Sequence, residues 1–87
     1  MNVLFAPSFA RQLKTLERDL LEEVYEKIEL FRDQKNHKKL KVHKLSGRLK
    51  GRYSFFVNYK IRIVFRYLKT KPKSAYLMAI GGHDIYK

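Results

Sequence analysis

The chain has 87 residues, of which 45% are hydrophobic and none is cysteine, and its formal net charge at pH 7 is +12. This length suits one small domain, residues 1–87, and the lack of cysteine excludes disulfides and thiolate metal sites. No apolar run approaches the ~18 residues that a membrane helix needs. The first residues also lack the charged start and long apolar stretch of a secretory signal. We therefore expect a cytoplasmic protein without a membrane partner.

The charge is distributed unevenly along the chain. Residues 1–34 hold five Lys/Arg and seven Asp/Glu, a net −2, whereas residues 35–87 hold fifteen Lys/Arg and one acid, a net +14. Self-repulsion on this scale destabilises a compact domain, so we expect a polyanionic partner. Nucleic acid is favoured. An acidic protein or a membrane surface is the alternative, but no basic amphipathic helix supports the membrane.

The first half of the chain predicts a strand followed by helices. Residues 2–6 (NVLFA) form a short apolar run closed by a proline, and Ser8 is placed to cap a helix. Asp19 with Glu22 resembles a capping box, which would start a second helix at Leu20. Although one long helix could carry the apolar residues, we therefore expect a helical hairpin. The apolar residues at helical spacing are Phe9, Leu13, Leu16, Leu20, Leu21, Val24, Ile28 and Phe31.

The second half predicts a strand meander. Residues 33–41 are polar and basic and should form a loop, and residues 48–68 (RLKGRYSFFVNYKIRIVFRYL) alternate as two strands and a turn. A two-residue loop would mix the faces, whereas a three-residue loop at residues 58–60 keeps one face apolar. The other face then carries repeated cations: Arg48, Lys50, Arg52, Arg62 and Arg66.

The last strand is expected at residues 74–80 (SAYLMAI), which are apolar on both parities and so should have neighbours on both edges. The resulting order β-α-α-β-β-β is an α+β fold of two layers, with the helical hairpin packed on an antiparallel sheet.

The tail GGHDIYK is the second informative stretch. Gly81 and Gly82 allow a sharp turn that presents His83, Asp84 and Tyr86 at the end of the sheet. An imidazole titrates near neutral pH, so His83 can take or give a proton in a transition state. A lone histidine near a C-terminus is usually a surface residue, but the neighbouring cationic face favours catalysis here.

These residues suit metal-free RNA cleavage, which needs a proton acceptor for the 2′-hydroxyl, positive charge on the phosphorane, and an acid for the leaving 5′-oxygen. His83 could be the acid or the base, and Arg62 could grip the phosphate with its planar fork. Carboxylates are almost absent from the basic half and the histidines lack ligand spacing, so we expect neither a metal nor a cofactor.

Other residues of the two stretches could bind the RNA itself. Tyr86 and Phe56 offer rings for stacking an unpaired base. Arg66 is either a further RNA contact or part of a solvated edge, and Asp84 either orients His83 or caps the tail. The cations expected to position the RNA backbone are Arg48, Lys50 and Arg52.

The segment HKLSGRLKGRYSFFVNYKIRIVF, the ending AIGGHDIYK and the order of elements resemble the RelE/ParE superfamily of type II toxins, above all the RelE and YafQ-like mRNA interferases. The resemblance covers essentially the whole chain. It implies an endoribonuclease toxin that cleaves mRNA, commonly in the ribosomal A site, and is silenced by a cognate acidic antitoxin.

The resemblance also implies roles for single residues. Arg62 stands where the family contacts the scissile phosphate, and His83 where some members transfer a proton. Lys50, and less directly Arg48 and Arg52, match a basic residue that lines the cleft. His43 matches a histidine that YafQ-like members carry before the L-x-G segment.

Parts of the family pattern are missing. The second histidine and the aspartate of YafQ-like members are replaced by Phe56 and Lys60, and the glutamate base of some relatives has no counterpart. The identity of the general base therefore stays open among the remaining groups.

Two other functions are compatible with the same fold class. The ParE branch inhibits DNA gyrase without catalysis and lacks this terminal histidine pattern. A basic nucleic-acid-binding module without catalysis is the third interpretation, and a requirement for His83 would distinguish the nuclease from both.

Overall fold

The computed structural model describes residues 1–86, with the exception of the side chains of His83 and Tyr86. In this part of the chain, five strands form one sheet in the order β1-β5-β4-β3-β2. β1 pairs in parallel with β5, and the other neighbours are antiparallel. The strands are β1 (Asn2–Phe5), β2 (His43–Lys44), β3 (Tyr53–Phe56), β4 (Arg62–Leu68) and β5 (Ser74–Gly81). The helices are α1 (Pro7–Leu13), α2 (Arg18–Phe31) and the 3-10 turns η1 (Gln34–Asn36), η2 (Gly47–Leu49) and η3 (His83–Tyr86).

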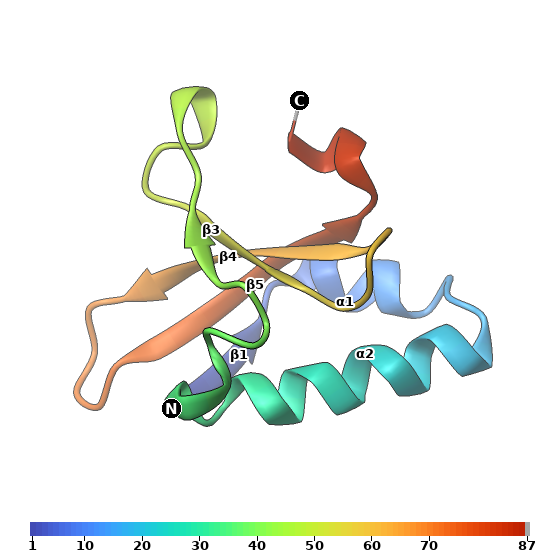
Figure 1. Ribbon diagram of the computed structural model, residues 1–87, viewed down its shortest axis with the longest axis horizontal. Coiled ribbons are helices and arrows are strands. Elements are labelled where there is room, and N and C mark those ends of the chain that lie inside the picture. Colours follow the sequence, from blue (N-terminus) through green and yellow to red (C-terminus); the bar gives the residue numbers. More distant parts are fainter. Residues whose placement is uncertain (87) are drawn as a thin grey trace.

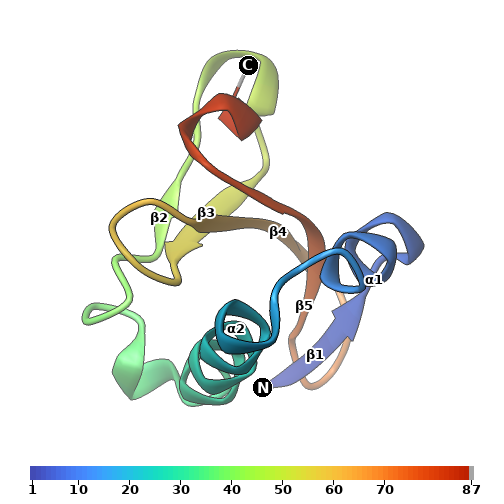
Figure 2. The same cartoon turned by 90° about the vertical axis from the view of Figure 1, so that its right-hand side faces the viewer.

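The two α-helices occupy different places around the sheet. α2 lies across one face, while η2 and η3 both project from the opposite side (Figure 1). α1 follows β1 and lies beside β5 (Figure 2), where the Gln12 side-chain amide bonds both backbone groups of Ile80 at 3.0 Å. The expected α+β fold, with two helices packed on the sheet, is confirmed, and β5 has neighbours on both edges as expected. The parallel pairing of β1 with β5 departs from the antiparallel sheet that was expected.

The core lies between α2 and the sheet face formed by alternate residues of the strands. Phe31 of α2 is fully buried and stacks on Phe55 of β3 with ring centroids 4.2 Å apart. It meets Phe65 of β4 edge-on at 4.8 Å. Ile28 and Val24, one and two turns earlier in α2, are buried in the same cluster. The helical apolar stripe and the apolar strand face therefore meet, as their periodicities predict.

The hairpin of β3 and β4 has the register that burial favours. Tyr53 pairs with Phe65, and Phe56 pairs with Arg62. The Val57 N–H donates to the Ile61 carbonyl at 2.9 Å, so the loop comprises residues 58–60 as predicted. A left-handed residue is not used in this turn. Instead, the Asn58 side-chain oxygen accepts from the backbone N–H groups of residues 60 and 61, at 2.8 and 2.9 Å.

Both predicted helix starts are wrong. α1 has Ala6 as its N-cap and a proline at its first position, while the Ser8 hydroxyl donates to the Met78 carbonyl at 3.2 Å. α2 begins at Arg18 with Glu17 as N-cap and no side-chain cap, so Asp19 lies inside the first turn. A carboxylate there still interacts favourably with the helix dipole, which explains the misleading pattern.

The entry to the hairpin also differs from the prediction. β3 begins at Tyr53, and the residues before it form η2 and a turn in which Gly47 and Gly51 have φ values of 66° and 85°. Such backbone angles favour glycine and interrupt a strand. The short strand β2 was not expected and pairs with β3 at the far edge of the sheet. Among the described residues, no helix is long and apolar enough to span a bilayer.

Candidate functional site

The sheet face opposite α2 carries Arg62, which is the first residue of β4 and follows the 58–60 turn. Phe56 of β3 is the residue that pairs with Arg62, and the guanidinium carbon of Arg62 lies 3.6 Å from the centroid of the Phe56 ring. Its Nη1 donates to the Asn58 carbonyl at 2.8 Å and contacts the Ile61 carbonyl at 3.4 Å. Within the described structure both bonds use Nη1, so Nε and Nη2 are left to fork onto a phosphate. The stacked ring and the carbonyls fix the plane of this fork.

The turn that holds Arg62 is tied to α2. The Asn58 side-chain NH₂ donates to a carboxylate oxygen of Glu23 at 2.7 Å, across 35 positions of sequence. The Asn58 side-chain oxygen closes the turn, and the Asn58 backbone carbonyl accepts a hydrogen bond from the Arg62 guanidinium. Asn58 is therefore a positioning residue that the sequence analysis missed, and a polar residue at a hairpin turn was its only local signal.

The Phe56 ring is covered by cationic side chains of this protein, whereas the sequence predicted that it would stack on a base. Besides the guanidinium at 3.6 Å, the Lys41 ammonium lies 5.2 Å from the ring centroid. Lys41 has a φ of 56°, and the preceding carbonyl of Leu40 accepts from the Phe56 N–H at 2.9 Å. The segment before β2 thus brings a second cation to the ring, which is an arrangement that cation–π attraction stabilises.

His43, on β2, is a candidate proton acceptor on the same face. His43 pairs with Ser54 of β3. Ser54 and Phe56 are two residues apart on that strand, so their side chains point to the same face. The His43 Nδ1 lies 3.0 Å from the Lys41 carbonyl, and because a carbonyl only accepts, the neutral ring carries its proton on Nδ1. Nε2 then holds the lone pair, 3.5 Å from the Ser54 hydroxyl. In this tautomer, Nε2 of the exposed imidazole is the ring nitrogen that can accept a hydrogen bond.

The C-terminal turn folds back over this face. Gly81 pairs with Arg62, and a Cβ at Gly81 would overlap the Ile85 side chain. The missing side chain is what allows Ile85, and η3 with it, to pack onto the end of β5. A Cβ at Gly82 would lie 3.6 Å from the Lys60 carbonyl, so the tail also adjoins the hairpin turn.

The predicted residues of the tail are placed only in part. Asp84 is exposed, and its carboxylate lies beside Gly82. The side chains of His83 and Tyr86 lie outside the described residues, so their predicted roles stay predictions. The backbone of η3 begins two residues after the position that pairs with Arg62.

The sequence matches no protein-family model and no curated protein. Solved structures are similar over nearly the whole chain. The YoeB–YefM complex from Staphylococcus aureus matches with a TM-score of 0.71 at 18% identity, covering 95% of this chain and 97% of the other. The archaeal RelE–RelB complex from Pyrococcus horikoshii gives 0.70 at 16%, with 93% and 92% covered. The YoeB/ParE toxin from Agrobacterium tumefaciens gives 0.68 at 16%, with 95% and 99% covered.

The fold is that of the RelE/ParE toxins. At these identities the likeness concerns the backbone, and it confirms the resemblance in fold that the sequence motifs indicated.

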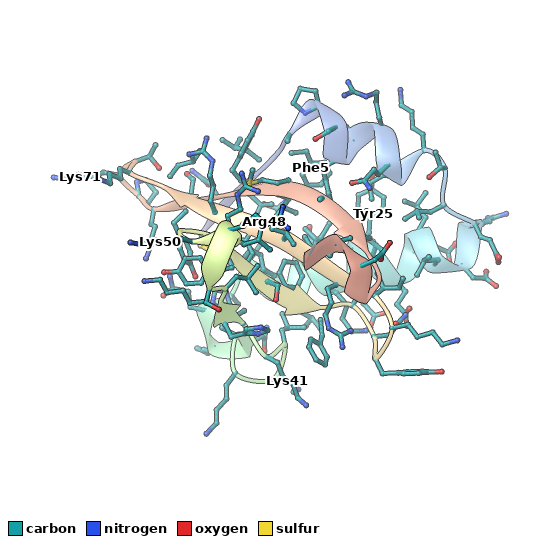
Figure 3. All side chains as sticks on the ribbon, turned by 90° about the horizontal axis from the view of Figure 1, so that it is seen from above. Phe5, Tyr25, Lys41, Arg48, Lys50 and Lys71 are labelled. Carbon is teal, nitrogen blue, oxygen red and sulfur yellow. The ribbon has the colours of Figure 1, made fainter. Side chains whose placement is uncertain are left out.

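Of the remaining predicted cations, Arg66 lies within β4, whereas Arg48 and Lys50 lie outside the strands of the sheet. The expectation that Arg48 and Lys50 lie on the first strand of the hairpin, on the same face as Arg62, is wrong, because they belong to η2 and the turn after it. Both are exposed and project from the η2 segment (Figure 3). Arg52, which precedes β3, is half-buried, and Arg66 is exposed with its guanidinium carbon 5.2 Å from the Tyr76 ring centroid.

Among the described side chains, this sheet face offers cations and the imidazole of His43. In the part of the chain that the structure describes, no group of three His, Cys, Asp or Glu side chains could hold a metal ion. Arg62 supplies a fixed positive charge, and His43 supplies a lone pair on the same face. His43 lies opposite Val64, two residues along β4 from Arg62, so the two backbone positions are about 12 Å apart across two strand spacings.

Proposed function

We propose that this chain is the toxin of a type II toxin–antitoxin system and acts as a metal-independent endoribonuclease. It cleaves mRNA on the ribosome in the cytoplasm, thereby inhibits translation, and is silenced by a cognate acidic antitoxin. Residues 1–87 form a single toxin domain. The RelE/ParE fold supports this proposal, as do the YoeB–YefM and RelE–RelB complexes among the similar structures.

The observation that carries the proposal is the Arg62 guanidinium, stacked on Phe56 and bonded through Nη1. In RNA cleavage the 2′-oxygen attacks the phosphorus, and the 5′-oxygen leaves with its bonding electrons. The phosphorane carries extra negative charge, and a preorganised guanidinium stabilises that charge more than it stabilises the substrate. Its rigid setting matters because no reorganisation is then needed during the reaction.

Two imidazoles complete the mechanism. His43 takes the 2′-hydroxyl proton at Nε2, and His83 gives a proton to the leaving 5′-oxygen. The products are a 2′,3′-cyclic phosphate and a free 5′-hydroxyl. Tyr86 stacks a base, while further positive side chains and Asp84 orient the RNA around the reacting phosphate. The positive side chains are Lys50, Arg48, Arg52 and Arg66.

The proposal is tested by primer extension on a reporter mRNA during pulsed expression. Discrete cuts within translated codons are expected with the wild type. Arg62→Ala should reduce the cleavage rate about 100-fold, because loss of one transition-state donor costs about that much. His83→Ala should reduce it similarly. The matched control is Arg11→Ala, which removes an exposed arginine of α1 and should leave the cuts intact.

The second candidate is a ParE-like inhibitor of DNA gyrase, favoured by the similarity to the YoeB/ParE toxin. Growth arrest with intact mRNA, unchanged by His83→Ala, would exclude the nuclease. Inhibition of supercoiling by purified gyrase would then identify the ParE-like activity, and its absence would leave nucleic-acid binding alone.

A further inference from the structure

A pocket of about 490 Å³ opens at the other end of the sheet from the 58–60 turn. Tyr53 of β3 and Tyr67 of β4 line it, with their rings 4.8 Å apart in a T-shaped contact. Tyr67 is five residues after Arg62 on the same strand, so the two side chains point to opposite faces, about 16 Å apart along the strand. The pocket is therefore separate from the Arg62 site.

Three ammonium groups surround these rings. Lys44 comes from β2, and Lys69 and Lys73 come from the turn between β4 and β5. All three are exposed, and Lys73 lies 4.0 Å over the Tyr67 ring. None of the lining residues is acidic. Lys50 and Lys71 lie toward the same end of the molecule (Figure 3) and add further positive charge there.

The polar groups of the pocket are mainly donors. Burial, and secondarily the neighbouring Tyr53, raise the pKa of Tyr67, so its hydroxyl stays protonated at neutral pH. Thr70 is engaged with the Pro72 carbonyl and the Ser74 hydroxyl. Phosphate oxygens bring only acceptors, which this lining satisfies, and the tyrosine rings offer apolar surface to a sugar or base. The Asp and Glu side chains of an acidic peptide carry the same charge but no sugar or base to cover the tyrosine rings.

We propose that this lysine–tyrosine pocket, formed by Lys44, Tyr53, Tyr67, Lys69 and Lys73, binds the phosphate backbone of a second segment of single-stranded RNA. The inference rests on the proposed function in taking RNA as the substrate class. Its role is affinity, because the pocket is on the other face from the group that stabilises the phosphorane. Its volume lies within the range of about 300–1,000 Å³ that is usual for small-ligand sites.

The test is fluorescence anisotropy of a labelled, 2′-O-methylated single-stranded RNA, which the protein cannot cleave. Lys44→Gln/Lys69→Gln/Lys73→Gln should weaken binding at least tenfold (about 1.4 kcal/mol) and reduce the slope of log K against log salt by about 2. The control, Lys35→Gln/Lys38→Gln/Lys39→Gln, removes the same charge from exposed residues outside the pocket and should weaken binding less than about threefold.

Two outcomes would overturn the proposal. Equal losses in both triple variants would mean that net charge alone binds RNA. Unchanged RNA binding with lost binding of a polyglutamate peptide would assign the pocket to an acidic protein instead. The anisotropy assay does not depend on cleavage, so failure of the wild type to cut mRNA and failure of the pocket are separate results. If the wild type cuts, the pocket variant should raise KM and leave kcat unchanged.

Discussion

Arg62 owes its position to a residue that strand alternation does not reveal. Asn58 closes the hairpin turn through its side-chain oxygen, binds Glu23 through its NH₂, and receives Arg62 at its carbonyl. The carboxylate of α2 thus acts on the guanidinium through a neutral amide. A direct ion pair would occupy the fork of the arginine, whereas this arrangement fixes the turn and leaves the fork to a substrate.

We expect Asn58→Ala to lower kcat for RNA cleavage about tenfold with little change in KM. The turn loses three side-chain hydrogen bonds, each with a net contribution of about 0.5–1.5 kcal/mol, so thermal stability should fall as well. Steady-state kinetics and thermal unfolding measure the two effects.

The control is Glu23→Gln, which keeps an acceptor oxygen and should retain most of kcat. In an Arg62→Ala background, Asn58→Ala should have no further effect on kcat, because it acts through Arg62. A second tenfold loss in that background would show that Asn58 acts by another route.

At the scale of elements, the end of β5 controls where the C-terminal turn lies. Gly81 pairs with Arg62 and has no side chain, and Ile85 takes the space that a Cβ would fill. The Ile85 N–H then donates to the Gly82 carbonyl at 3.1 Å and closes η3. Because η3 begins at His83, this local packing decides how the tail approaches the sheet face that carries Arg62.

Gly81→Ala should therefore impair cleavage more than stability. The added methyl group displaces Ile85, which is only half-buried, so we expect the free energy of unfolding to fall by about 1 kcal/mol, at the low end of overpacking effects. Cleavage should fall at least tenfold. Gly82→Ala is the matched control, because the nearest atoms to its Cβ lie 3.4 and 3.6 Å away. Equal activity of the two variants, measured by primer extension, would contradict the placement of η3.

At the scale of the whole molecule, the acids and bases are separated in space. The acid-rich helix α2 covers one sheet face, and η2, which carries Arg48, projects from the opposite side (Figure 1). The ion pairs of the described side chains all lie within α2 and its C-cap, between residues 18 and 32. The basic residues after position 34 therefore repel one another without acidic partners among the described residues, a cost that a polyanion relieves.

Stability should rise with salt as a result. Raising NaCl from about 20 to 200 mM screens repulsion between exposed charges, and a gain of about 1 kcal/mol corresponds to a rise in Tm of roughly 4–8 °C for a domain of this size. Lys35→Gln/Lys38→Gln/Lys39→Gln should show a smaller rise, measured by differential scanning calorimetry. A Tm that is independent of salt in both proteins would contradict this account.

The spacing of apolar residues along the sequence correctly predicted those features that depend on which side chains are buried. Because a one-residue slip would expose Phe55 and Ile63, alternation alone gave the hairpin register. Helical spacing gave the buried face of α2, and the motifs indicated the fold family. The same alternation failed at Arg48 and Lys50, where the regular spacing of cations continued through a segment that two glycines with positive φ turn away from the strand.

The sequence by itself thus determined the apolar faces, the fold class and the cationic half of the molecule, because these follow from spacing and composition within short stretches. Only the tertiary structure decided how Arg62 is held, where α1 lies and which residue caps each helix. Those features depend on contacts between residues far apart in the chain, such as Asn58 with Glu23, Gln12 with Ile80 and Ser8 with Met78. A local pattern contains no information about a partner 35 to 70 positions away.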